Sequence, residues 1–285
     1  MRAFVPDYEM LAPGNLRAVL QLLGARPGEW RPFAGGTDLM VLLESGQLEH
    51  KKFVSLWGVK ELTGILESEF AVTLGALTTY SEVLRSRVIA QEFPMLAQAA
   101  RETGGVATQN RGTLGGNIVN ASPAADSPPV LLVYDAELQL TSASGSRWVS
   151  YASFHTGYKK TLLEPDEIVS HIRLPRRSGR SREQYRKVGT RKAQAISKIC
   201  FAGKADIENG VVRGARLALG SIAPVPLRCF KTESVLEGQR LTPDVIAAAC
   251  REMEGEIAPI NDIRSTELYR RRVTVNLLEA FLKAL

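Results

Sequence analysis

Glycines and short polar side chains are concentrated in one stretch, Arg111 to Asp126, which reads RGTLGGNIVNASPAAD. Gly112, Gly115 and Gly116 have no Cβ atom, so the main chain can adopt positive φ and bring its N–H groups close to an anion. The side chains that could add neutral hydrogen bonds are Thr113, Asn117, Asn120 and Ser122. This composition favours a loop that holds a diphosphate. The dinucleotide fingerprint G-x-G-x-x-G and the P-loop pattern are both absent, so a different fold must present the loop.

A second glycine cluster, PFAGGTDLM, runs from Pro32 to Met40. Gly35 and Gly36 are suited to a turn between a strand and a helix, and Thr37 and Asp38 stand where helix N-caps occur. Main-chain N–H groups at such a junction are free to bind a phosphate or a ribitol chain. The alternative is a tight turn with a capped helix and no ligand. Two such loops roughly 80 residues apart favour a ligand.

Four ordered segments resemble one known family. They are AGGTDL, TLGGNIVNASPAAD, FHTGYKKTLLEPDEIVSHIRLP (residues 154–175) and YRKVGTRKAQAIS (residues 185–197). Together they resemble the FAD-binding medium subunit of the molybdenum hydroxylases, the group that contains xanthine dehydrogenase and carbon monoxide dehydrogenase. The resemblance covers essentially the whole chain and implies that FAD is the cofactor.

The resemblance also implies which residues contact FAD. The first segment would wrap the diphosphate with the main chain of Pro32, Phe33, Ala34, Gly35, Gly36, Thr37, Asp38 and Leu39. The second would meet the diphosphate and the ribitol with Thr113, Gly116, Asn117 and Asn120. These two sets are called the first glycine loop (residues 32–40) and the second glycine loop (residues 111–126) below.

Further residues are implied in the same way. Asp126 would bind the adenosine half of FAD, and Ile168 or Val169 would lie against the ring system. Lys187 would stand near the pyrimidine edge of the flavin, where a cation stabilises the anionic reduced form. Tyr158 and Lys159 belong to a segment that passes near the isoalloxazine in relatives.

Each of these residues also has a plain structural interpretation. Asp126 precedes Ser127 and two prolines, so it could cap a helix whose first turn contains proline. Lys187 lies in a short strand-like run, where most lysines face water. Tyr158 with two following lysines could form a solvated turn.

Length and composition favour two domains. The chain has 285 residues, of which 45% are apolar, and a net charge of +6 with a pI near 9.3. Nine cations and a single aromatic residue lie in the segment 173–192, so the interleaved aromatics of a single-strand binder are missing and nucleic acid is not an expected partner. We expect an FAD-binding domain over residues 1–176, a basic linker over 177–184 and a C-terminal domain over 185–285.

The three cysteines and three histidines are scattered. Cys200, Cys229 and Cys250 form no Cys-x-x-Cys pair, so neither an iron–sulfur cluster nor a zinc site is expected, and no catalytic acid, base or nucleophile is assigned. No apolar run approaches twenty residues and the N-terminal segment has no signal-peptide pattern. We therefore expect no membrane span and a cytoplasmic location.

The element pattern predicts an α+β chain. Helices are expected at 15–23, 81–89, 94–103, from 243 onward and at 266–284; strands are expected at 53–56, 72–76, 137–141, 168–174, 195–207 and 211–219. By resemblance, the first domain has the vanillyl-alcohol-oxidase-like (PCMH) flavin fold in two parts. The second is a small α/β domain in which helices cover an antiparallel sheet.

The implied function is electron transfer within a multi-subunit molybdenum hydroxylase. By resemblance, 2Fe-2S clusters on a small subunit would pass electrons from a molybdenum-cofactor large subunit to the flavin of this chain, and NAD, oxygen or another acceptor would take them up. Two alternatives stay open: a stand-alone flavin oxidoreductase, and a flavin-free assembly or scaffold protein that has kept the fold.

Overall fold

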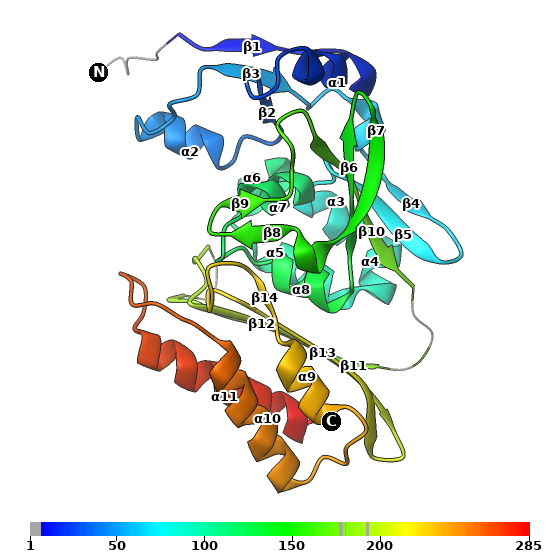
Figure 1. Cartoon of the computed structure of the whole chain (residues 1–285), viewed down its shortest axis with the longest axis vertical. Coiled ribbons are helices and arrows are strands. Elements are labelled where there is room, and N and C mark those ends of the chain that lie inside the picture. Colours follow the sequence, from blue (N-terminus) through cyan, green and yellow to red (C-terminus); the bar gives the residue numbers. More distant parts are fainter. Residues whose placement is uncertain (1–6, 177–178, 180, 192–193) are drawn as a thin grey trace.

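The computed structural model describes residues 7–176, 179, 181–191 and 194–285. Three larger sheets follow one another along the long axis of the molecule, each with its own helices, and a two-stranded hairpin flanks the middle one (Figure 1). Residues 177, 178 and 180 of the expected linker lie outside the described residues. Residues 181–184 belong to a strand, so the linker is shorter than we expected.

The N-terminal part is a small parallel sheet with two helices. Its strands are β1 (Glu9–Leu11), β2 (Arg31–Phe33) and β3 (Lys52–Ser55), in the order β1-β3-β2; its helices are α1 (Leu16–Ala25) and α2 (Leu39–Glu44), followed by the 3-10 turn η1 (Lys60–Leu62). The Asn15 side chain caps α1 by accepting from the Ala18 N–H, and the helix buries Val19, Leu20 and Leu23. The helix expected at 15–23 is thereby confirmed.

The central part is an antiparallel sheet covered by helices. Its strands are β4 (Ile65–Glu67), β5 (Ala71–Gly75), β10 (Ile168–Pro175), β6 (Glu137–Ser142) and β7 (Gly145–Ser150), in that spatial order. Its helical segments are α3 (Tyr80–Arg85), α4 (Arg87–Glu92), α5 (Pro94–Glu102), α6 (Val106–Arg111), α7 (Leu114–Asn120), α8 (Pro128–Val133) and η2 (Tyr151–Ser153). The hairpin strands β8 (His155–Gly157) and β9 (Lys160–Thr161) lie beside α7 and α8 (Figure 1).

One expected helix of this region is divided in two. Residues 81–89 contribute to both α3 and α4, which are separated at Ser86, whose backbone is extended (ψ 118°). The Ser86 hydroxyl accepts from the Ile89 N–H and starts a new helix there. A serine in a helical pattern can therefore act as an N-cap, which the hydrophobic periodicity alone did not show.

The C-terminal part is an antiparallel sheet with helices on its outer face. Its elements are β11 (Ser181–Val188), β12 (Ile199–Glu208), β13 (Val211–Gly220), β14 (Leu227–Arg228), α9 (Phe230–Leu236), α10 (Pro243–Glu256) and α11 (Glu267–Lys283). Asn209 and Gly210 form the hairpin turn with φ of 52° and 76°. Thr242 caps α10 with Pro243 at its first position, as expected.

Two details of this domain differ from expectation. Strand β12 begins at Ile199 instead of residue 195, because the preceding segment turns toward the central part. The apolar pattern of the last helix, with Leu268, Val275, Leu278 and Leu282, predicts a buried face; in α11 Leu268 is 77% exposed, whereas Leu278 and Leu282 are buried. The inner face of α11 also includes Thr274 and Phe281.

Helix α8 joins the central and C-terminal parts. All six of its residues are buried, and it packs against β12, β13 and β14 on one side and the central helices on the other (Figure 1). The central apolar core includes Tyr185, Cys200, Ala202 and Ala218 of the C-terminal sheet. The core is thus continuous across the domain boundary. None of the helices in the described residues combines the length and apolarity needed to cross a bilayer.

Candidate functional site

The first glycine loop connects β2 to α2 and presents unused main-chain donors. Gly36 has a φ of +78°, and a Cβ there would lie 2.6 Å from the Phe33 ring, so only glycine fits this turn. In the described part of the chain, the N–H groups of residues 35–39 donate to no protein acceptor, whereas Met40 N–H bonds to the Gly36 carbonyl. Successive free N–H groups in a turn before a helix form an anion-binding concavity.

The two glycine loops touch each other. A Cβ at Gly35 would collide with the main-chain carbonyl of Arg111, so the loops approach as closely as two backbones allow. The Arg111 guanidinium stacks on Trp57 at 3.6 Å from the ring centroid, which fixes this side chain next to the contact. Residues about 75 positions apart therefore form one wall of one site.

The second glycine loop uses its glycines differently from our expectation. Gly112, Gly115 and Gly116 all have negative φ. The Leu114 and Gly115 N–H groups bond inward to the carbonyls of Thr78 and Ala76, and a Cβ at Gly115 would lie 2.6 Å from the Ala76 Cβ. Gly115 thus serves close packing of α7 on the sheet, and the expected positive φ is wrong at these positions.

Gly116 borders the space between the loops. Its N–H donates to the Thr113 hydroxyl, which caps α7. A Cβ at Gly116 would lie 2.8 Å from Thr113 Oγ1 and 3.9 Å from the Ala34 Cβ of the first loop. A larger residue would therefore disturb the helix cap and narrow the space between the loops.

Two asparagines on α7 have orientations fixed by their neighbours. The Ser127 hydroxyl donates to Asn117 Oδ1 at 2.8 Å, so the Asn117 amide nitrogen is the group left to donate to a ligand. Lys159 Nζ donates to the carbonyl and to Oδ1 of Asn120 at 2.8 and 2.9 Å, and Asn120 Nδ2 donates to Asp38 at 3.0 Å. Lys159 therefore ties the β8–β9 hairpin to both loops.

Asp126 and Lys187 form a buried ion pair between the two domains. Lys187 Nζ lies 2.7 Å from Asp126 Oδ2, and the two side chains are 6% and 11% exposed. Lys187 also donates to the Glu102 carbonyl at 2.8 Å, and Ser197 Oγ donates to Asp126 Oδ1 at 2.6 Å. Burial raises the pKa of Asp126 above its ordinary value, and the Lys187 ammonium offsets part of this effect.

This contact corrects two sequence-based interpretations. The helix-cap alternative for Asp126 is wrong, because the N-cap of α8 is Ser127 and the carboxylate turns to Lys187. The solvent-facing alternative for Lys187 is wrong, because its side chain is buried. The two residues, which the resemblance assigns to the adenosine half and to the pyrimidine edge of FAD, are in direct contact at 2.7 Å.

Ile168 and Val169 are not brought to an open face. Each is 4% exposed; Ile168 lies in the N-terminal core, against which Ala34 packs, and Val169 lies in the central core. Their segment is nonetheless close to the second glycine loop, because Ala76 donates to the Ser170 carbonyl and accepts from Gly115. Both side chains are buried in apolar cores, so the expected packing of one of them against the ring system does not follow from this arrangement.

The structure adds two residues that the sequence did not indicate. Ser127 orients Asn117, and Ser197 completes the partners of the Asp126 carboxylate. Ser127 adjoins Asp126 in the chain, which is a weak signal. Ser197 is 71 residues from Asp126, and no local pattern marks it. Tyr158 is 65% exposed, in agreement with a solvated turn.

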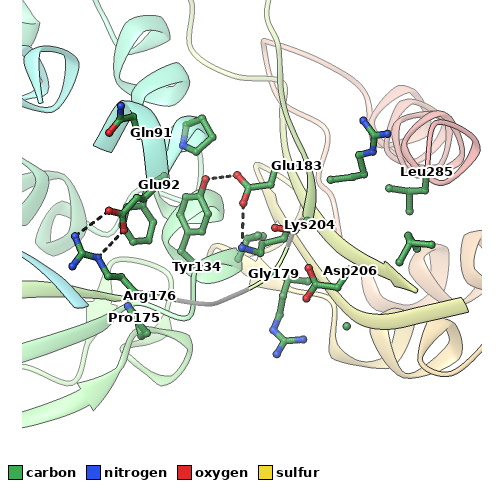
Figure 2. Close-up of a pocket in the computed structure, with 18 residues that line it drawn as sticks. Gln91, Glu92, Tyr134, Pro175, Arg176, Gly179, Glu183, Lys204, Asp206 and Leu285 are labelled. Carbon is green, nitrogen blue, oxygen red and sulfur yellow. Dashed lines mark hydrogen bonds and ion pairs between the residues drawn. The ribbon is translucent and has the colours of Figure 1, made fainter. Parts of the chain in front are cut away.

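A separate cavity of about 740 Å³ lies where the central and C-terminal parts meet away from the loops (Figure 2). Two ion pairs lie within its lining: Arg176 with Glu92 at 2.7 Å and Lys204 with Glu183 at 3.1 Å. Tyr134 donates to Glu183 at 2.6 Å. This cavity includes none of the residues assigned to the cofactor.

The fold and the site define a dinucleotide-binding α+β protein in which a second domain helps to close the site. Comparison with known proteins gives the family: residues 6–177 match the FAD-binding domain in molybdopterin dehydrogenase, and residues 183–285 match the CO dehydrogenase flavoprotein C-terminal domain. The chain belongs to the FAD-binding chains of the molybdopterin dehydrogenases, which are oxidoreductases. The resemblance stated from the four sequence segments is confirmed.

Relatives cover the chain almost completely. The glyceraldehyde dehydrogenase medium chain of Sulfolobus acidocaldarius is 30% identical over 98% of each chain. The xanthine dehydrogenase FAD-binding subunit of Escherichia coli O157:H7 is 31% identical and covers 90% of this chain and 88% of its own. A chain of the carbon monoxide dehydrogenase structure from Hydrogenophaga pseudoflava superposes with a TM-score of 0.94 at 27% identity, covering 99% and 98%.

Proposed function

We propose that this chain is the flavin subunit of a multi-subunit molybdenum hydroxylase, which takes electrons from 2Fe-2S clusters and passes them to NAD, oxygen or another acceptor. The observation that carries this proposal is the row of N–H groups at residues 35–39, which have no acceptor among the described residues and lie against the second glycine loop. Family membership supplies the cofactor class, and the cradle fits the diphosphate of FAD.

The residues fit FAD as follows. The N–H groups of the first glycine loop would donate to the diphosphate, with Pro32, Phe33, Ala34, Gly35, Gly36, Thr37, Asp38 and Leu39 forming the turn. Thr113 and Gly116 hold the start of α7, and the amide of Asn117 donates to the diphosphate or ribitol. Asn120 and Lys159 would border the other side of the diphosphate-binding site. Bound FAD would supply the ability to accept and release electrons singly or in pairs.

Lys187 and Asp126 would serve the same end of the cofactor. We keep Lys187 at the pyrimidine edge of the flavin, where its charge favours the reduced anion, and place Asp126 beside it. Asp126 holds the ammonium in position and partly neutralises it. The C-terminal domain thereby contributes a charged group to a site built mostly by the first domain.

The proposed partners are a 2Fe-2S small subunit and a molybdenum-cofactor large subunit. The relatives that support this step are named medium chains, which implies companion chains of other sizes. We place the assembly in the cytoplasm, where the cysteines, which are free in this chain, would stay reduced.

One binding series tests the proposal. The purified chain is titrated with FAD, FMN and ADP, and released cofactor from the chain as isolated is identified by mass. A cradle for the diphosphate predicts tight binding of FAD, weaker binding of ADP and the weakest of FMN, which has a single phosphate. Failure to bind FAD would overturn the proposal. Co-purification with an iron–sulfur chain tests the electron donor, and reduction of bound flavin by NADH tests NAD as the acceptor.

A further inference from the structure

Ser197 is buried at the end of a segment that reaches from the C-terminal domain into the cofactor site. It is 1% exposed, its Oγ donates to Asp126 Oδ1 at 2.6 Å, and its carbonyl accepts from the Ser221 hydroxyl at 2.9 Å. Ser221 N–H in turn donates to the Pro123 carbonyl at 2.7 Å. The hydrogen bonds with Asp126 and Ser221 therefore hold Ser197 against the second glycine loop.

The carboxylate of Asp126 is shared between two donors with different effects. Lys187 holds Oδ2 and brings a positive charge, whereas Ser197 holds Oδ1 and is neutral. The other partner of Lys187 is the Glu102 carbonyl, which carries no net charge. The charge that Lys187 presents to its surroundings therefore depends on whether Asp126 is ionised. A hydrogen bond to the ionised form favours that form, and Ser197 supplies one.

We propose that Ser197 is a positioning residue that keeps Asp126 ionised, and thereby sets the net charge that the Asp126–Lys187 pair presents to the flavin. This inference rests on the proposed function, in which the pair lies beside the pyrimidine edge. Ser197 acts through Asp126 and touches no cofactor atom in this scheme. The C-terminal domain thus tunes the flavin with a neutral hydroxyl as well as with a lysine.

The groups around the pair leave this role to Ser197. The titratable and charged groups that interact with Asp126 are Lys187 on β11, Tyr80 on α3, Tyr185 on β11 and Cys200 on β12. Burial raises the pKa of Tyr80, Tyr185 and Cys200, so all three stay neutral at ordinary pH. The Lys187 ammonium and the neutral Ser197 hydroxyl both favour the carboxylate form of Asp126.

The test compares Ser197→Ala with wild type in two measurements. The first is a carbon-13 NMR titration of the Asp126 carboxyl in the FAD-free chain, assigned with D126N. The second is the reduction potential of bound FAD against pH. Loss of a hydrogen bond to a charged group predicts that the Asp126 titration, and the bend that it causes in the potential curve, move up by about one pH unit. S197T, which keeps the hydroxyl, should retain the wild-type curves.

Two control variants separate this effect from a general weakening of the contact between the two domains. Thr274→Val removes a buried hydroxyl that has no hydrogen-bond partner in the described residues, and it should leave both curves unchanged. Asp135→Asn weakens the ion pairs to Arg216 and Arg228 at the far end of α8, so it loosens the same domain contact without touching Asp126. The proposal is overturned if S197A leaves both curves unchanged, or if D135N shifts the potential as S197A does.

The two measurements also distinguish this proposal from the proposed function. If the wild-type chain binds no FAD, the proposed function fails, while the carboxyl titration still reports on Ser197 and Asp126. If FAD binds and the titration moves but the potential does not, the pair is remote from the flavin and the inference is wrong by itself.

Discussion

The two ends of the proposed cofactor site are built in different ways. The cradle end consists of main-chain atoms: free N–H groups at residues 35–39 and a backbone contact between Gly35 and Arg111. The other end consists of side chains from two domains, Asp126 and Ser197 with Lys187. A backbone cradle can be occupied only if certain side chains are absent, whereas the ion pair requires particular side chains to be present.

This difference separates binding from tuning. Main-chain N–H groups are neutral and fixed, so they bind a diphosphate with the same strength over a wide pH range. A buried carboxylate beside an ammonium changes its charge with pH and with its hydrogen bonds. We therefore expect changes in the cradle to remove the cofactor and changes at the ion pair to alter its potential.

The largest expected effect comes from Gly35→Ala. Its Cβ would collide with the Arg111 carbonyl, which cannot move like the end of a flexible side chain, so the loops must separate. We expect loss of FAD retention and a fall in the free energy of unfolding of about 3 kcal/mol. Gly14→Ala, where a Cβ meets open space, is the matched control. Flavin content and thermal unfolding measure the outcome. Normal FAD retention in Gly35→Ala would show that the close contact between the two loops is not needed to bind the cofactor.

Gly116→Val should be nearly as severe for the cofactor but milder for the fold. The valine side chain presses on the Thr113 cap and narrows the space beside Ala34, while the C-terminal domain stays folded. Gly255→Val, a helical glycine in open space, is the control. Fluorescence titration with FAD measures the change. Wild-type affinity in the variant would remove Gly116 from the site.

Lys187→Met should leave FAD bound and change its potential. Removing the ammonium lowers the potential by about 30 mV, which for two electrons corresponds to roughly 1.4 kcal/mol. Asp126 is then buried without its cation, so the free energy of unfolding falls by about 3 kcal/mol. Lys204→Met breaks a similarly buried pair with Glu183 away from the loops, and it should lower stability without changing the potential. Equal potentials in both variants would mean that Lys187 is structural.

The smallest effect concerns the hairpin that ties the loops together. Burial lowers the pKa of His155 to about 4, from 6.5 in the unfolded chain. The unfolded chain therefore binds the proton more readily between these values, and stability is lost as the pH falls through this window. At pH 5 the free energy of unfolding is therefore about 2 kcal/mol lower than at pH 8. His155→Phe should flatten this slope in denaturant unfolding, and an unchanged slope would exclude His155 as its source.

Much of the fold followed from local patterns. The Thr242 cap, the Asn209-Gly210 turn and the strand patterns at 137–141 and 168–174 each depend on neighbouring residues, and the sequence predicts each of them. The division at Ser86 was missed because one serine can sit within a helix or start one. Leu268 was misassigned because periodicity does not say where the partner surface ends.

The sequence by itself indicated the cradle, because Gly35, whose Cβ would collide with another backbone, and Gly36, which has positive φ beside the Phe33 ring, are visible in the chain as a glycine pair. Only the tertiary structure decided that Gly115 packs on Ala76 and that Asp126 meets Lys187 and Ser197. A charge or a hydroxyl has no fixed role in a sequence, since its pKa and its partners depend on burial and on residues brought from another domain.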